Sequence, residues 1–252
     1  MLNVLSLGGG LQSTAIAEMA LDSKCRRIKK PDLIIHADTG SESVETMQTV
    51  DRIGKLCKKS HVDFKIVKSE KGSLYTYLFQ KNGLNRIGDA SCTDLFKIRP
   101  INRYVKKLVD TNTPKPWVRM WIGITTDERH RARENPLKWI RNYFPLLENN
   151  MSRDDVKFWM EKNRPGILVK KSGCFHCHFQ SSNQWSQLKK NYPKYFDMAL
   201  QLERNFKDNG GKIGLFKGQS IEGFDNNVTL QDFGFDIQPG DVSCSSSGVC
   251  FY

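Results

Sequence analysis

The sequence predicts an α/β protein with a doubly wound, mostly parallel sheet, because short apolar segments alternate with segments of helical periodicity. Residues 2–7 are mainly apolar and are followed by three glycines. Apolar residues at helical spacing then continue through residue 21. Residues 33–36 and the helical pattern of residues 44–56 repeat this order. Two successive strand-helix units are typical of parallel sheets, whose ligands bind at the carboxyl ends of the strands.

The remaining elements divide the chain into two expected regions. We expect a third strand at residues 64–67, a basic helix at residues 96–108 and a fourth strand at residues 117–124. After residue 145 strand patterns fade, residues 151–163 and 183–206 look helical, and the chain from residue 208 is rich in Gly, Asn, Asp and Ser. Residues 1–145 are therefore expected to form a nucleotide-binding α/β domain, and residues 146–252 a helical, irregular, cysteine-containing lid.

Composition points to a globular protein that attracts polyanions. The 252 residues are 38% hydrophobic, which is enough for a substantial core. The formal charge of +12, from 39 Lys and Arg against 27 Asp and Glu, favours nucleic acid or nucleotides as partners, although a solvated basic surface explains it equally well. No apolar run approaches the ~20 residues of a membrane span, and no secretion signal precedes the first strand. We therefore expect a cytoplasmic protein without membrane contact.

The glycines at positions 8–10 lie between a strand and a helix, where a phosphate can be bound. Free backbone N–H groups and the positive end of a helix dipole meet at such a turn, and the Ser13 and Thr14 hydroxyls can donate to phosphate oxygens. No Lys follows the glycines as in a Walker loop, and the Rossmann glycine spacing is absent. For the glycines alone, a plain tight turn is the alternative.

This segment resembles the PP-loop of the ATP pyrophosphatase and phosphosulfate reductase superfamily, whose usual form is Ser-Gly-Gly-X-Asp-Ser. Gly9, Gly10 and Ser13 match it, whereas Gly8 replaces the usual Ser and Gln12 the usual Asp. The resemblance implies that ATP, with Mg²⁺, is the cofactor. The expected ATP contacts in this segment are Ser6, Gly8, Gly9, Gly10, Gln12, Ser13 and Thr14.

Two further strand ends resemble the same relatives. The run Asp38-Thr39-Gly40 is similar to the Asp-Thr-Gly that lines their nucleotide site, although such residues alternatively cap the next helix. The segment 123–131 resembles their Gly-X-Arg-X-X-Glu, with Thr125 in place of the Arg. The resemblance implies further cofactor contacts from Asp38, Thr39, Gly40 and Gly123, and catalytic roles for Asp38, Glu128 and Arg131. For Arg131, a solvated charge cluster is the alternative.

The seven cysteines favour metal binding or redox chemistry, because nothing indicates an oxidising compartment. Cys174 and Cys177 form a CxxC pair, whose spacing suits a metal, a cluster or a redox dithiol. Cys92, Cys244 and Cys250 are distant in sequence but can converge in a fold. Cys25 and Cys57 lie in apparently helical stretches and are expected to be small buried hydrophobes.

The order of all these motifs resembles a subset of uncharacterised phosphosulfate reductase-like PP-loop relatives, over nearly the full length. That resemblance implies one four-thiolate set, made by Cys92, Cys174, Cys177 and Cys250, with Cys244 as the alternative tail ligand. Thiolates fit either an iron-sulfur cluster or zinc. Clusters in PP-loop sulfurtransferases favour iron-sulfur, of the 4Fe-4S type.

Three functions remain. The first is an ATP-dependent, AMP-forming sulfurtransferase that thiolates a nucleotide or a base of nucleic acid, tRNA or DNA, docked on the basic helix of residues 97–107. The second is a sulfonucleotide reductase using Cys250 or Cys244, although the tail Cys-Phe-Tyr lacks the Glu-Cys-Gly-Leu-His motif of those enzymes. The third is a non-enzymatic nucleotide- or DNA-binding module. The oligomeric state stays open, with a homodimer among the options.

Overall fold

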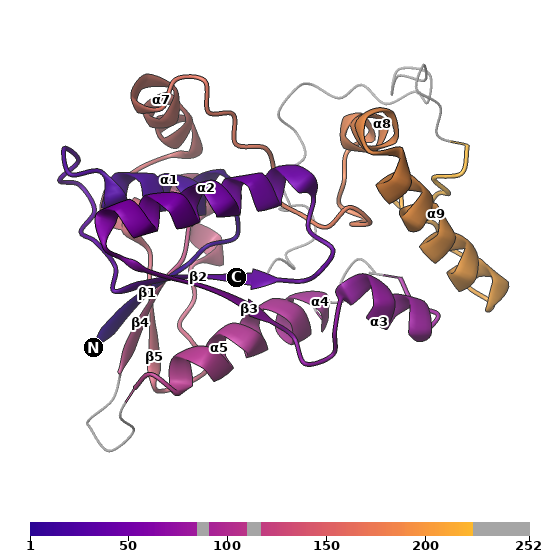
Figure 1. Cartoon of the computed structure of the whole chain (residues 1–252), viewed down its shortest axis with the longest axis horizontal. Helices are drawn as coiled ribbons and strands as arrows, with labels where there is room; N and C mark the ends of the chain where they lie inside the picture. Colours follow the sequence, from indigo (N-terminus) through magenta and orange to yellow (C-terminus); the bar gives the residue numbers. More distant parts are fainter. Residues whose placement is uncertain (85–90, 110–116, 224–252) are drawn as a thin grey trace.

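A five-stranded, entirely parallel sheet forms the centre of the molecule (Figure 1). The computed structural model describes residues 1–84, 91–109 and 117–223. The strands are β1 (Leu2–Ser6), β2 (Leu33–Asp38), β3 (Asp63–Lys68), β4 (Val118–Trp121) and β5 (Ile140–Tyr143). Their order, β3-β2-β1-β4-β5, reverses direction between β1 and β4, which confirms the predicted doubly wound fold.

Helices cover both faces of this sheet, as alternating side chains of the strands require. Leu5 and Ile34 pack into one core with α1 (Leu11–Leu21) and α2 (Val44–Ser60). Their neighbours Val4 and Ile35 enter a second core with α5 (Arg99–Lys106) on the opposite face. Figure 1 shows α1 and α2 on one side of the sheet and α5 on the other. Both faces are therefore buried, which is usual for a parallel sheet.

Helix α7 (Arg153–Asn163) packs against α1 and is fixed there by charge. The short helix α6 (Pro145–Glu148) precedes it, and Val156 and Met160 of α7 belong to the same core as α1. The Arg164 Nε donates to the buried carboxylate of Glu18 at 2.6 Å, and Arg52 pairs with the same carboxylate. The expected division of the chain at residue 145 stays a prediction.

A separate apolar cluster joins the later helices to α3 (Leu74–Gln80). Trp185 of α8 (Ser182–Asn191) and Phe196 of α9 (Pro193–Asp208) pack with Leu78 and with the CxxC segment. The sequence predicted one helix over residues 183–206, but α8 ends before Pro193, which cannot continue the hydrogen bonding of a helix. Among the described residues, no helix is both long and apolar enough to span a membrane.

Several elements differ from the sequence-based expectation. The basic helix of residues 96–108 is preceded by α4 (Ser91–Thr93) and begins as a π-helical turn, η1 (Asp94–Ile98), before α5. The sequence missed β5 and the 3-10 helix η2 (Thr126–Arg131), because polar residues such as Arg141 interrupt the apolar pattern of a short edge strand. Cys25 follows α1 instead of lying in a helix, whereas Cys57 is buried in α2 as expected.

Candidate functional site

The glycine turn between β1 and α1 presents backbone amides at a helix N-terminus. Gly10 is the N-cap of α1 and has no side chain to accept the first-turn N–H groups. The Gly8 N–H donates to the Ser13 Oγ at 3.2 Å, and this hydroxyl donates to the Gly10 carbonyl at 3.4 Å. The turn is thus held in shape by Ser13 and offers its remaining amides to an anion.

Two glycines allow neighbouring elements to approach this turn closely. Gly9 has a φ of +75°, and a Cβ there would lie 2.9 Å from the Cγ2 of Thr46 on α2. A Cβ on Gly123, just after β4, would lie 2.8 Å from the backbone nitrogen of Ser13. Gly9 therefore lets α2 pack closely against the turn, and Gly123 lets the end of β4 contact it.

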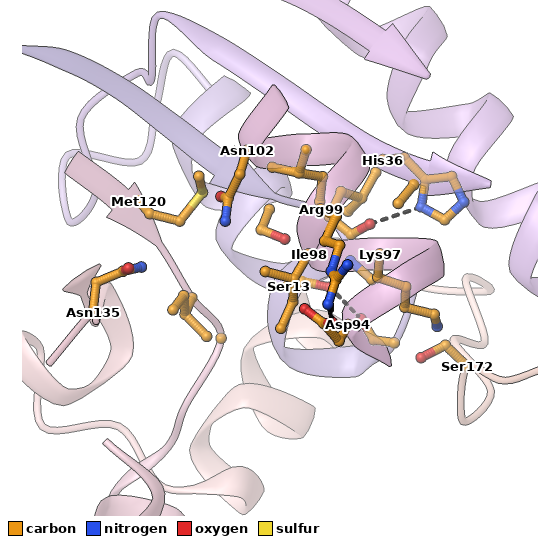
Figure 2. A pocket seen from close by; sticks show the side chains of 18 of the residues that line it. Ser13, His36, Asp94, Lys97, Ile98, Arg99, Asn102, Met120, Asn135 and Ser172 are labelled. Carbon is orange, nitrogen blue, oxygen red and sulfur yellow. Dashed lines mark hydrogen bonds and ion pairs between the residues drawn. The ribbon is translucent and has the colours of Figure 1, made fainter. Parts of the chain in front are cut away.

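A cavity of about 500 Å³ opens at the carboxyl ends of β1, β2 and β4, at the point where the strand order reverses. Figure 2 shows its side chains. One wall is apolar and includes Ile101, Met120 and Leu137, whereas Lys97 and Arg99 bring positive charge to it. An apolar wall beside cations and free amides suits a flat base and its phosphates.

The structure brings together about half of the residues predicted to contact a nucleotide. Ser6, Gly8, Gly10, Gln12, Ser13 and Gly123 line the cavity, whereas Gly9, Thr14, Asp38, Thr39 and Gly40 do not. Asp38 accepts from the Gly40 N–H at 2.7 Å and pairs with Lys68 at 3.2 Å. It shapes the turn after β2, and a catalytic role for it stays a prediction.

Glu128 and Arg131 line a second cavity of about 410 Å³, which shares the glycine turn with the first. The Gln12 Nε2 donates to the Glu128 carboxylate at 3.2 Å, and Arg131 pairs with that carboxylate at 2.8 Å. A chain of polar contacts therefore runs from the turn into the second cavity. Gln12, which replaces the usual Asp, lines both cavities.

Lys97 connects the first cavity to the cysteines. Its ammonium lies 3.5 Å from the buried Glu42 carboxylate, and Glu42 accepts from the Thr39 hydroxyl at 3.1 Å. The same hydroxyl lies 3.4 Å from the Cys174 sulfur. The pKa of Lys97 is raised, chiefly by Glu42 and against the opposing effect of burial, and negative charge on three nearby cysteines would raise it further. Those cysteines are Cys174, Cys92 and Cys177.

Backbone contacts hold the CxxC segment against the loop after β2. The Phe175 N–H donates to the Ser41 carbonyl at 2.9 Å, and Glu42 forms a β-bridge with Cys174. Burial raises the pKa of the Cys174 thiol well above its ordinary value. Without a bound cation this thiol is therefore uncharged at neutral pH, because the thiolate is poorly solvated there.

The donor atoms fit a thiolate-bound centre, although the described ligand set is incomplete. Three cysteines from two distant segments interact electrostatically with one ammonium, and soft sulfur donors of this kind suit zinc or an iron-sulfur cluster. Across residues 1–84, 91–109 and 117–223, no three His, Cys, Asp or Glu side chains are arranged to hold a metal ion. Cys250 and Cys244, the predicted and alternative fourth ligands, lie outside the described residues.

Sequence reasoning missed several residues of this site. His36 lines the first cavity, and its Nδ1 donates to the Leu7 carbonyl at 2.7 Å, so its Nε2 is an unprotonated acceptor. Glu42 and Ser172 belong to no motif. A histidine within the apolar run of β2 was a usable signal for His36, whereas only the three-dimensional structure places Glu42 beside Lys97 and Ser172 beside the glycine turn.

The fold and the first cavity define an α/β protein with a glycine turn and a nucleotide-sized cavity after its first strand. The family model of the phosphoadenosine phosphosulfate reductase domain matches residues 3–164. The chain therefore belongs to this family, within the adenine nucleotide alpha hydrolase-like superfamily, as its motifs predicted. The match to the family model ends before the CxxC segment. A search of curated proteins found none that matches this chain.

The solved structures similar to this chain include a reductase and a tRNA thiolase. Phosphoadenylyl-sulfate reductase from Candida auris, in a phosphate complex, shares 18% identity at a TM-score of 0.48, covering 69% of this chain and 81% of that one. The U34-tRNA thiolase NcsA from Methanococcus maripaludis, with its 4Fe-4S cluster, shares 17% identity at a TM-score of 0.48. That alignment covers 81% of this chain and 72% of the thiolase.

Proposed function

We propose that this chain is an ATP-dependent, AMP-forming PP-loop enzyme that thiolates a nucleotide or a base in a nucleic acid. The observation that carries the proposal is the position of Lys97. This side chain lines the nucleotide-sized cavity and also pairs with the buried Glu42, which shares the Thr39 hydroxyl with Cys174. A nucleotide bound in the first cavity and the cysteines would therefore both interact with the charge of the same ammonium.

ATP fits the first cavity with its adenine on the apolar wall and its phosphates at the glycine turn. The amides at the N-terminus of α1 favour the phosphate charge, and Lys97 and Arg99 add two cations. Arg99 pairs with Asp94 at 2.6 Å, which fixes its guanidinium. Because Gln12 offers an amide oxygen in place of a carboxylate, Mg²⁺ is expected to be held mainly by phosphate oxygens and water.

The proposed reaction has two displacements. A carbonyl oxygen of the acceptor attacks the α-phosphorus of ATP, the bond to the β-phosphate oxygen breaks, and pyrophosphate leaves. A sulfur nucleophile then attacks the activated carbon and AMP departs with the oxygen. The turn amides stabilise the departing pyrophosphate, and Lys97 and Arg99 compensate the charge that develops on the phosphates.

Cys92, Cys174, Cys177 and Cys250 are the residues proposed to hold an iron-sulfur cluster, with zinc as the alternative. A bound cluster would supply an iron site for carrying sulfur. The Lys97 ammonium offsets the negative charge of the thiolates, which favours the deprotonated form that binding requires. The Thr39 hydroxyl donates to Glu42 and lies 3.4 Å from the Cys174 sulfur.

A sulfonucleotide reductase is the second candidate, because the matching family is that of the phosphoadenosine phosphosulfate reductase domain. In that reaction a thiolate attacks the sulfur of a phosphosulfate, so that an S-sulfocysteine forms and the nucleotide leaves. Cys250 and Cys244 are the candidate thiols. The first cavity accommodates an adenine nucleotide in either reaction.

The test is anaerobic purification, analysis of iron and acid-labile sulfide, and then two assays on the same sample. Pyrophosphate release from ATP that depends on an added tRNA, DNA or nucleotide acceptor is the expected result. Sulfite formation from a phosphosulfate nucleotide in the presence of an added dithiol reductant, without ATP turnover, would establish the reductase instead. Nucleotide or DNA binding with neither product would leave a binding module.

A further inference from the structure

The second cavity adjoins the first across the glycine turn. It lies between this turn, η2, α7 and the segment 167–172, and its volume is about 410 Å³. Gly10, Gln12, Gly123 and Ser172 line both cavities. A ligand in the second cavity would therefore lie next to a nucleotide in the first. Its size is within the range of cavities that hold small organic ligands.

The lining of the second cavity is predominantly basic. Its charged members are the basic Arg131, Arg153, Lys157, Lys170 and Lys171 and the acidic Glu128 and Glu161. Lys157 pairs with Asp154, and Lys170 with Glu45, both at 2.9 Å. Arg153 and Lys171 form no ion pair with any other described residue. Two cations thus remain without a carboxylate partner there, as an anionic ligand requires.

Apolar side chains lie beside these cations. Met160, Ile167, Leu168 and Val169 belong to the same lining, and Leu168 is 83% exposed. On α7, Arg153, Lys157 and Met160 recur at helical spacing and so share one face. Apolar and cationic groups in one cavity match a ligand that has both a flat organic part and a phosphate.

The basic helix that the sequence indicated is less available to a second anion once ATP occupies the first cavity. Lys97 pairs with Glu42, Arg99 pairs with Asp94, and Arg103 pairs with Glu70. These ion pairs offset the charge of the first part of the predicted docking helix. For the phosphate of a second ligand beside ATP, Arg153 and Lys171 of the second cavity are therefore the better site.

We infer that the second cavity binds a nucleotide unit, with its phosphate at the basic side chains and its base against the apolar ones. The inference rests on the proposed function, since this unit would be the acceptor that receives sulfur. A free nucleoside monophosphate and one nucleotide of a nucleic-acid strand present the same chemistry to the cavity. The adjacency of the two cavities would place that base near the α-phosphorus of ATP.

The test uses the full chain, with the first cavity saturated by a non-hydrolysable ATP analogue. The double variant Arg153→Glu/Lys157→Glu changes two exposed residues in the first half of α7. Acidic side chains are well tolerated near a helix N-terminus, so folding should persist, which melting curves check. The matched control is Arg103→Glu/Lys106→Glu on α5, which alters the net charge equally.

The probes are a short fluorescent single-stranded RNA and the four nucleoside monophosphates as competitors. The α7 variant should weaken binding of the probes at least about tenfold, because contacts between cations and phosphates are lost. Its affinity for the ATP analogue should stay within about twofold of the wild type, and the control should lose far less RNA affinity. Competition by monophosphates indicates a free nucleotide, whereas RNA binding without such competition indicates a strand.

Three results would overturn the inference: unchanged binding of the probes in the α7 variant, an equal loss of the ATP analogue, or no binding of any probe to the wild type. An equal loss would make the second cavity an extension of the ATP site. Failure of the proposed function looks different, because probes would still bind in the second cavity while the wild type released no pyrophosphate from ATP.

Discussion

Lys97 and Glu42 form an ion pair, 3.5 Å between the ammonium and a carboxylate oxygen, at the boundary between the first cavity and the buried Cys174. The Glu42 side chain is 1% exposed and that of Lys97 is 34% exposed. No motif in the sequence indicated that these two residues would pair. The pair nevertheless connects the first cavity to the cysteines of the candidate site.

Removing the ammonium should destabilise the protein, because Glu42 would stay buried without its cation. We expect Lys97→Met to lower the free energy of unfolding by about 2 kcal/mol, less than for a fully buried pair because water reaches Lys97. Urea unfolding measures this. The double variant Lys97→Met/Glu42→Gln should recover part of the loss, and no recovery would contradict the pairing.

Gly8 offers a cleaner test of nucleotide binding than Gly9. A Cβ at Gly8 would lie 3.8 Å from the Ser13 Oγ, so Gly8→Val should fold and project into the first cavity. We expect ATP affinity to fall at least about tenfold, since the side chain obstructs phosphate approach. Titration calorimetry measures the affinity, with Gly223→Val as a control in open space.

Gly9→Val should behave differently, because its positive φ and the nearby Thr46 Cγ2 make a side chain unfavourable there. A lower melting temperature than that of Gly8→Val is expected. If Gly9→Val is as stable as the wild type, the packing role assigned to Gly9 is wrong.

Single Ser substitutions should separate the ligand cysteines from the structural ones. Cys92→Ser, Cys174→Ser, Cys177→Ser and Cys250→Ser should each lose iron and sulfide in anaerobically prepared protein, because a hydroxyl replaces a soft thiolate. Cys25→Ser and Cys57→Ser should retain both. If Cys250→Ser keeps the centre, Cys244 becomes the fourth ligand. If the purified protein is colourless and contains one zinc ion, the predicted cysteine ligands stand but the predicted iron-sulfur cluster is wrong.

His36 should make stability depend on pH. Burial lowers its pKa below the ordinary 6.5, with the Glu42 carboxylate opposing, so the unfolded chain takes up the proton first. The free energy of unfolding should therefore fall as pH decreases from about 6.5. His36→Gln should reduce this slope, whereas His61→Asn at an exposed site should not. An unchanged slope in His36→Gln would contradict the prediction.

The sequence was sufficient for the strands β1 to β4 and for the glycine turn, because their signals are local. The apolar run before Gly8 and the helical pattern after Gly10 define a strand, a turn and a helix without tertiary information. Glu42 and Ser172 carry no such local signal. Their roles depend on the CxxC segment lying across the loop after β2, which is a contact between positions more than 100 residues apart.

The prediction of secondary structure also failed where polar residues or a proline interrupted an apolar pattern. Arg141 and Asn142 concealed β5, and Pro193 divided a helical pattern into α8 and α9. The motif that contains Glu128 and Arg131 located their segment in the sequence but not the cavity they line, because α7, which packs against α1, forms another wall of that cavity. Long-range packing of this kind cannot be deduced from motif spacing.

The most direct measurement is the identity of the nucleotide formed from ATP labelled at the α-phosphorus. The protein, prepared anaerobically, is incubated with Mg²⁺, a sulfide source and pooled tRNA, DNA or mononucleotides, and the labelled product is separated by chromatography. The account predicts AMP, formed only with an acceptor and in step with thiolated product. Formation of ADP, or sulfite release from a phosphosulfate nucleotide with no AMP from ATP, would contradict it.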